Sequence, residues 1–218
     1  MWLCLGLAAA QAALGVNFAQ MYEDLYNKYQ YHADLNLSHA RHAIRALPPD
    51  VTSVLDVGCS HGLGVSALWT RGIIANGVDI APTAVEMANK HRVQHRNCGS
   101  FPCFQAASAL ALPFPDKSFD AIISTDVLEH LDYDDILTAF KNFVRVAKRY
   151  MVIQIATSTE RVTEFLERMH RDKKYRQISH LHTTVLPLDF WASKLRRVPG
   201  VASVRVVDGL VNANLTAV

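Results

Sequence analysis

The sequence predicts an α/β fold with a mostly parallel sheet, and two patterns indicate it. Short apolar runs alternate with segments of helical periodicity from about residue 51 to residue 156, and repeated β-α units of this kind build parallel sheets with helices on both faces. The chain then closes with two strand-like runs around Asp208-Gly209, a dipeptide typical of a tight hairpin turn. We therefore expect parallel strands followed by a C-terminal antiparallel hairpin.

Each element follows from a local pattern. Residues 18–47 lack Pro and Gly and are predicted to be helical, and Pro48 and Pro49 end that segment. Strands are expected in the short apolar runs at 51–57, 73–78, 101–107, 119–124 and 150–156. Helices are expected at 61–71, 82–91, 136–144 and 188–197. A polar, basic segment, 157–184, interrupts this alternation.

Composition limits the classes of function. A chain of 218 residues suits one domain with a sizeable core. The net charge of +2 is too small to indicate a nucleic-acid partner or a membrane surface. The ten histidines are scattered without HExxH or similar ligand spacing, so no metal site is expected.

The N-terminal residues 1–16 are apolar and uncharged, and they include the run LCLGLAAAQAALG. This run resembles a secretory signal, although no Lys or Arg precedes it, and it is short for a membrane-spanning helix. A signal or retained anchor would direct the protein to the secretory pathway or a membrane. The alternative is an N-terminal helix that packs on the domain of a cytoplasmic protein.

The cysteines give no clear framework. Cys98 and Cys103 are five residues apart and could form a disulfide in an oxidising compartment. We expect two free thiols instead, because no CxxC motif or second cysteine pair indicates a disulfide framework or zinc. Cys59 is expected to pack inside a turn.

The most informative stretch is VLDVGCSHGLG, residues 54–64, which predicts a buried strand, a glycine turn and the start of a helix. Glycines at 58, 62 and 64 let the backbone approach a ligand, and the first N–H groups of the helix suit an anionic group. A tight turn without a ligand is the alternative. The glycine spacing differs from the GxGxxG of dinucleotide-binding turns, which argues against NAD.

Asp79 ends the next predicted strand, about 20 residues past the turn, where an acid can accept hydrogen bonds from ribose hydroxyls. Alone, Asp79 could equally cap the helix that begins at Pro82. Its pairing with the glycine turn favours a nucleoside-binding site.

Three stretches resemble class I S-adenosylmethionine-dependent methyltransferases, especially the type-11 group. They are VLDVGCSHGLG, GVDIAPTAVEMA and ALPFPDKSFDAIISTDVLEHL, and the resemblance covers about residues 51–156. It implies a Rossmann-like seven-stranded, mostly parallel sheet in a domain over residues 17–218, with 157–184 as a lid-like insertion. It also implies S-adenosylmethionine as cofactor and methyl transfer to a small-molecule acceptor.

The resemblance assigns roles to individual residues. The methionine part of the cofactor would be held by Asp56, Gly58, Ser60 and Gly62. Asp79 would bind the ribose, Ile80 would flank the adenine, Ser108 and Ala109 would meet the adenine edge, and Ser124 would lie near the sulfonium. Two residues depart from the pattern, because Ser60 replaces a usual glycine and Ser108 replaces a usual aspartate that accepts from the adenine amino group.

Methyl transfer requires alignment more than covalent help, but a hydroxyl or carbon acceptor needs a base. Candidates for this catalytic base are His130, Asp126 and His182; His61, in the glycine turn, is more simply a solvated residue. A structural role bonded to backbone is also open for His130.

The surroundings leave alternatives open. The basic side chains of 157–184, among them Arg171, Lys173 and Lys174, form either a solvated face or a lid that favours an anionic acceptor. The tyrosines at 22, 26, 29 and 31 either close the site or pack as an ordinary helix. The alternative function, which Ser108 favours, is a non-catalytic methyltransferase-fold protein that acts as a binding or partner subunit.

Overall fold

The computed structural model describes residues 17–29, 36–158, 167, 169–176, 178 and 181–216. The signal or anchor segment expected at residues 1–16 lies outside the described residues. Among the helices that the model describes, none has the length and apolar character needed to cross a bilayer.

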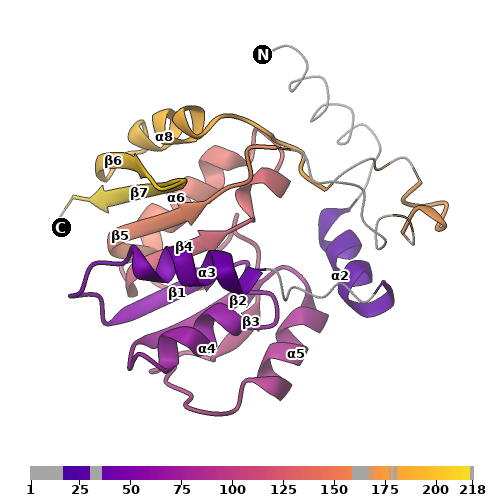
Figure 1. Ribbon diagram of the computed structural model, residues 1–218, viewed down its shortest axis with the longest axis horizontal. Coiled ribbons are helices and arrows are strands. Elements are labelled where there is room, and N and C mark those ends of the chain that lie inside the picture. The colour runs from indigo at the N-terminus through magenta and orange to yellow at the C-terminus, as the bar shows by residue number, and fades with distance from the viewer. Residues whose placement is uncertain are drawn as a thin grey trace.

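The described residues form one seven-stranded sheet in the order β3-β2-β1-β4-β5-β7-β6 (Figure 1). The strands are β1 (Ser53–Val57), β2 (Ile74–Asp79), β3 (Phe104–Ala106), β4 (Phe119–Thr125), β5 (Ala147–Gln154), β6 (Val201–Val207) and β7 (Leu210–Leu215). Strands β1 to β5 pair in parallel, whereas β7 runs antiparallel to both β5 and β6. The predicted mostly parallel sheet with a C-terminal antiparallel hairpin is confirmed.

Helices cover both faces of this sheet (Figure 1). One face carries α3 (Asn36–Arg45), α4 (Leu63–Trp69) and α5 (Pro82–His91), and the other carries α6 (Ile136–Val146) and α8 (Leu188–Arg196). Successive strand residues point to opposite faces, so Val54 is buried in one core and Leu55 in the other. This alternation explains why the strands of the sequence read as continuous apolar runs.

The N-terminal helical segment differs from the single helix predicted. It contains α2 (Phe18–Lys28), whose last turn leads to Tyr29 with non-helical φ −103° and ψ 5°, and then α3. The two helices bury different partners, since Ala43 of α3 packs on the sheet whereas Met21 of α2 packs in a separate cluster. One straight helix could not bury both apolar faces.

The expectation of two free thiols is wrong for Cys98 and Cys103, which form a disulfide with their Cα atoms 5.0 Å apart. The buried Asn76 explains their approach. Its side-chain amide donates to the carbonyl oxygens of Cys98 and Pro102, at 3.0 and 2.8 Å, and so folds the connecting loop back on itself. The sequence carries no local sign of this long-range contact. Cys59 is a buried free thiol, as expected for a residue that packs in the turn.

Candidate active site

A cavity of about 170 Å³ opens where the parallel strands end, the usual ligand position in sheets of this kind. Its lining comes from the carboxyl ends of four neighbouring strands and from the segments that follow them. These residues are Val57, Gly58 and Ser60 at β1, Asp79 and Ile80 at β2, 107–110 after β3, and Asp126, Val127, His130, Leu131, Asp132 and Asp135 after β4. Helix α2 adds Phe18, Tyr22 and Tyr26. The fold therefore gathers most of the predicted site residues around one space.

The glycine turn has the tight geometry that its sequence predicts. Gly58 lines the cavity with φ +81°, and a Cβ atom there would lie 2.1 Å from a methyl group of Val127. Gly62 has φ +74° and lies against the Phe104 ring, 2.5 Å from where its Cβ would be, and it is not among the described lining residues. Packing accounts for Gly62, whereas Gly58 has both a packing role and a place on the cavity wall.

Ser60 occupies the left-handed region, with φ +49°, which explains why a glycine is usual at this position. Its backbone N–H donates to Asp79 Oδ2 at 2.8 Å. The other oxygen of Asp79 accepts from the backbone N–H of Ala81 at 3.0 Å, at the start of α5. Asp79 therefore lines the cavity and holds the backbone that leads into α5, although no side chain caps the first turn of that helix. Ribose binding by Asp79 stays a prediction.

The carboxyl groups of Asp56 and Asp79 lie in a dry environment. Burial raises the pKa of Asp56 to about 7, and the negative charge of Asp79 acts in the same direction. Burial also raises the pKa of Asp79, against the backbone hydrogen bonds that favour its charged form. Asp56 lines a separate hollow of about 20 Å³, which shares Gly58 and Ser60 with the main cavity. The structure therefore sets Asp56 beside the cavity rather than on its wall.

The three residues that the resemblance assigns to the adenine, Ile80, Ser108 and Ala109, all line the cavity. The Ser108 hydroxyl accepts a hydrogen bond from the backbone N–H of Leu110 at 3.1 Å. Ser124 is placed differently from what the resemblance implied. It is fully buried, donates to the carbonyl oxygen of Val57 at 3.1 Å, and is absent from the described cavity lining.

Helix α2 covers the cavity through its aromatic side chains, beside the strand ends (Figure 1). The Tyr26 hydroxyl donates to Ser60 Oγ at 2.8 Å. The Tyr22 ring packs edge-on against the His130 ring, with centroids 5.6 Å apart. Tyr29 instead donates to Asp172 Oδ2 at 3.1 Å, and residue 31 lies outside the described residues. Two of the four tyrosines thus close the site, a role that their spacing alone could not separate from ordinary packing.

The described part of the insertion packs on the same helix. Met21 and Leu25 of α2 form one buried cluster, here called the cover cluster, with Met169, Tyr175, Ile178 and Leu181. The Tyr175 hydroxyl donates to Asp24 Oδ2 of α2 at 2.7 Å. Burial raises the pKa of Tyr175, and the hydrogen bond to the Asp24 carboxylate raises it further. Residues 159–166 of the insertion lie outside the described residues.

The basic side chains that the structure describes in the insertion do not reach the cavity. Arg171, Lys173 and Lys174 are exposed, and none of them is among the described lining residues. Lys174 Nζ lies 3.7 Å from Asp24 Oδ2 instead. The described lining contains four carboxyl groups, from Asp79, Asp126, Asp132 and Asp135, and neither Lys nor Arg. The cavity is therefore acidic.

Two of the three candidate bases, Asp126 and His130, line the cavity, and His182 lies against His130 outside the described lining. Asp126 lines it and pairs through Oδ2 with His39 Nδ1 of α3 at 2.5 Å. His130 lines it as well, and its ring centroid lies 4.8 Å from that of His182. His61 packs edge-on against Tyr26 at 5.2 Å and is not part of the described main lining.

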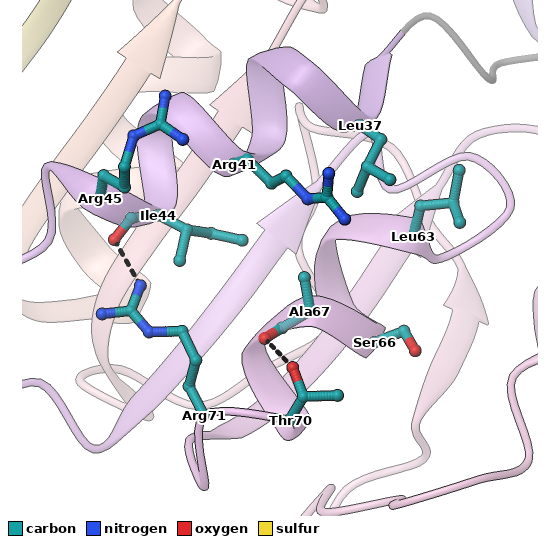
Figure 2. A pocket seen from close by; sticks show the side chains of 9 residues that line it. All are labelled: Leu37, Arg41, Ile44, Arg45, Leu63, Ser66, Ala67, Thr70 and Arg71. Atoms are coloured by element: carbon teal, nitrogen blue, oxygen red, sulfur yellow. Dashed lines mark hydrogen bonds between the residues drawn. The ribbon is translucent and has the colours of Figure 1, made fainter.

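A larger, open hollow of about 510 Å³ lies between α3 and α4 (Figure 2). Figure 2 shows Arg41, Arg45 and Arg71 around it, with Arg71 donating to the carbonyl oxygen of Ile44 at 3.0 Å. Its described lining includes none of the predicted site residues and no carboxyl group. This hollow is larger than the cavity at the strand ends, but the predicted site residues lie at the strand ends.

Several known proteins that are similar to this chain are methyltransferases. Residues 55–153 match a family model described as a methyltransferase domain. The O-methyltransferase resE of Aspergillus sclerotiorum is 35% identical over 98 residues, which are 44% of this chain and 35% of that protein. Ajmaline N-methyltransferase of Rauvolfia serpentina is 28% identical over 163 residues, 72% of this chain and 54% of that protein. The chain therefore spans about a third to a half of the length of these two relatives.

A solved structure shares the whole architecture. The PH0226 protein of Pyrococcus horikoshii OT3 superposes with a TM-score of 0.64 at 19% identity, covering 88% of this chain and 96% of that one. At this identity the likeness shows the fold alone. The chemistry has to be argued from the residues at the strand ends.

Proposed function

This chain belongs to the class I methyltransferases of the type-11 group, and on that premise we propose that it moves a methyl group from S-adenosylmethionine to a small-molecule acceptor. The observation that carries the proposal is the single cavity lined by Gly58, Asp79, Ile80 and Ser108. These residues come from the ends of three neighbouring strands and occupy binding positions of the family's pattern after each strand, although Ser108 stands where an aspartate is usual.

The residues present fit the cofactor. Each oxygen of Asp79 accepts one backbone N–H, and a carboxylate oxygen has a second lone pair that can accept from a ribose hydroxyl. Ile80 and Ser108 would meet the adenine, and Gly58 and Ser60 would hold the methionine part. The acidic lining suits a cationic ligand, since opposite charges attract strongly in a partly buried site.

When bound, S-adenosylmethionine supplies a methyl group on a positively charged sulfur, which needs no further activation. The protein then has to exclude water and orient the acceptor. Tyr22 and Tyr26 provide an aromatic cover over the cavity. Asp126 and His130 are the lining side chains that can take a proton from a hydroxyl acceptor, and the Asp126–His39 pair would hold the Asp126 carboxylate in place.

The electrostatics of the cavity bear on the acceptor. Among the described residues, four carboxyl groups line it, while Arg171, Lys173 and Lys174 of the insertion are exposed on the outside. An acidic wall repels an anion, so we propose a neutral or cationic acceptor in place of the anionic one considered from sequence.

Cofactor binding measured by calorimetry tests the proposal. Ser108→Asp keeps an oxygen for the Leu110 N–H and adds the charged acceptor that is usual in the family, so we expect it to tighten binding on the order of tenfold. The matched control is Ser100→Asp, which adds the same charge at an exposed position outside the described cavity lining and should leave affinity unchanged.

The transfer itself is tested with methyl-labelled cofactor and a pool of hydroxyl- and amine-bearing metabolites. Label in an acceptor product supports the proposal. The absence of any cofactor binding by the wild type would overturn it. Binding without transfer would instead support the non-catalytic alternative.

A further inference from the structure

One cluster beside the cavity combines two imidazoles and a carboxylate. We propose that Glu129, His130 and His182 form a binding site for a divalent transition-metal ion. Their potential ligand atoms all lie within 4.8 Å of one another. The sequence predicted no metal site because His182 is 52 residues from His130, so no short motif marks the group.

The distances and burial suit an ion that draws the group together. Two donor atoms bound to the same ion, at bond lengths of about 2.0–2.2 Å, lie roughly 3 Å apart. Side-chain rotations that move the donor atoms by about 1–2 Å would therefore complete the site. Glu129 is fully buried, and both histidines are half-buried. Nearby positive charge stabilises a buried carboxylate, and a bound metal ion would add such charge.

Hydrogen bonds orient both imidazoles in the same way. His130 Nδ1 lies 3.1 Å from the carbonyl oxygen of Leu181, and His182 Nδ1 lies 2.9 Å from that of Ser158. A carbonyl oxygen only accepts, so Nδ1 carries the proton in each neutral ring and Nε2 holds the lone pair. A metal-binding histidine typically donates its other N–H to a backbone carbonyl or a carboxylate in this way.

The backbone holds the three residues in place. Residues 183 and 184 are hydrogen-bonded to the 3₁₀ turn η2 (Leu128–His130) and to the residue after it. Thr184 N donates to the Glu129 carbonyl at 2.9 Å, and Thr183 Oγ1 donates to the Leu131 carbonyl at 2.7 Å. Glu129 Oε1 accepts from the backbone N–H of Ala156 at 2.9 Å. This support fixes His182 beside a turn that is distant in sequence, as a preorganised site requires.

The donor set identifies the class of ion. Mg²⁺ and Ca²⁺ prefer all-oxygen sites, whereas two imidazoles favour first-row transition metals such as Co²⁺ or Zn²⁺. Three protein ligands leave at least one position open, and His130 also lines the cavity. The carboxyl groups of Asp126, Asp132 and Asp135 line the same cavity and attract a cation.

A use for the ion follows if the proposed methyl transfer holds, and this step rests on that function. With the ion bound, His130 is a ligand, so the ion replaces His130 in helping the acceptor to lose its proton. An acceptor hydroxyl bound at the open position would lose its proton to water at a lower pH, and the oxygen would keep the electron pair while bound to the ion. No electron is gained or lost by the metal. A metal ion used in this way requires an acceptor that carries a hydroxyl group.

The test is a titration of the chelator-treated full chain with Co²⁺, followed by visible absorption and by metal analysis after gel filtration. We expect one equivalent to bind, with absorption bands of imidazole-bound Co²⁺. Glu129→Gln, which keeps an oxygen for the Ala156 N–H, and His182→Ala should each weaken binding more than about tenfold, because loss of even an outer hydrogen-bond partner costs roughly that much.

The matched control is His42→Ala, which removes a histidine that also bonds a backbone carbonyl but lies outside the cluster. It should bind Co²⁺ like the wild type. Failure of the wild type to bind one equivalent would overturn the site, as would wild-type binding by both cluster variants. Calorimetry with S-adenosylmethionine on the chelated protein keeps the two proposals separate, because it measures cofactor binding without the ion.

Discussion

Replacing Asp56 with asparagine should make the protein more stable at alkaline pH and change little at acid pH. Burial raises the pKa of Asp56 to about 7 in the folded protein, from an ordinary value of 3.8. The folded state therefore binds the proton more tightly than the unfolded state. The stability contributed by this proton is complete below about pH 4 and is lost as the pH rises through about 7.

The size of the effect follows from the two pKa values. A difference of about three pKa units, at about 1.4 kcal/mol each, is on the order of 4 kcal/mol. Roughly 3 kcal/mol of this should be lost between about pH 5 and about pH 8.5. Asp56→Asn has a similar shape and cannot ionise, so its free energy of unfolding should fall less steeply with pH. A shallower slope remains because the pKa of Asp79 is also raised.

Urea unfolding across this pH range measures the slope for both proteins. Asp120→Asn is an informative control because its pKa is perturbed in the opposite direction. Although burial acts against it, hydrogen bonds from Thr52 and the Lys148 ammonium hold the pKa of Asp120 at about 2. The stability that the ionised Asp120 carboxylate contributes is present above about pH 4 and is lost as the pH falls through about 2. The Asp120→Asn control should therefore be less stable than the wild type by a constant amount between about pH 5 and about pH 8.5. Parallel profiles for the wild type and Asp56→Asn would refute the reasoning.

Two further outcomes can be measured on the same protein. Tyr26→Phe removes the hydrogen bond to Ser60 and should lower the free energy of unfolding by about 1 kcal/mol, with faster proteolysis of α2; unchanged proteolysis would show that this bond does not hold the helix. The double replacement Cys98→Ser, Cys103→Ser opens a five-residue loop and should cost on the order of 2 kcal/mol of unfolding free energy at unchanged cofactor affinity. A loss of cofactor affinity would instead place the loop in the binding site.

The sequence was sufficient for the sheet and for grouping most of the residues that line the cavity. Buried parallel strands appear as short apolar runs, and residues at their carboxyl ends meet at one edge, so Gly58, Asp79 and Ser108 could be grouped without a structure. The same logic failed for residues inside the strands. The side chain of Asp56 faces the helix α4, and Ser124 is buried beneath the turn with its hydroxyl on a backbone carbonyl.

Contacts between distant segments account for what the sequence could not provide. His130 and His182 were each considered as a base, yet their proximity depends on hydrogen bonds between residues 183–184 and the turn at Glu129. The disulfide likewise depends on Asn76, a strand residue more than 20 positions earlier. Local pattern describes elements, whereas these pairs are set by how the elements pack.

Ser60 joins the glycine turn to the helix that covers the cavity. From sequence, serine in place of a usual glycine was a small change. In the structure it adopts φ +49°, a left-handed conformation that costs a residue with a Cβ atom roughly 1–2 kcal/mol. The hydroxyl that glycine lacks accepts the hydrogen bond of Tyr26, which contributes about 1 kcal/mol and offsets much of this strain. Because α2 and the insertion share the cover cluster, the same bond connects both parts of the cover to the turn that would hold the cofactor. The departure from the family pattern therefore has a physical reason at a point where the cover meets the cavity.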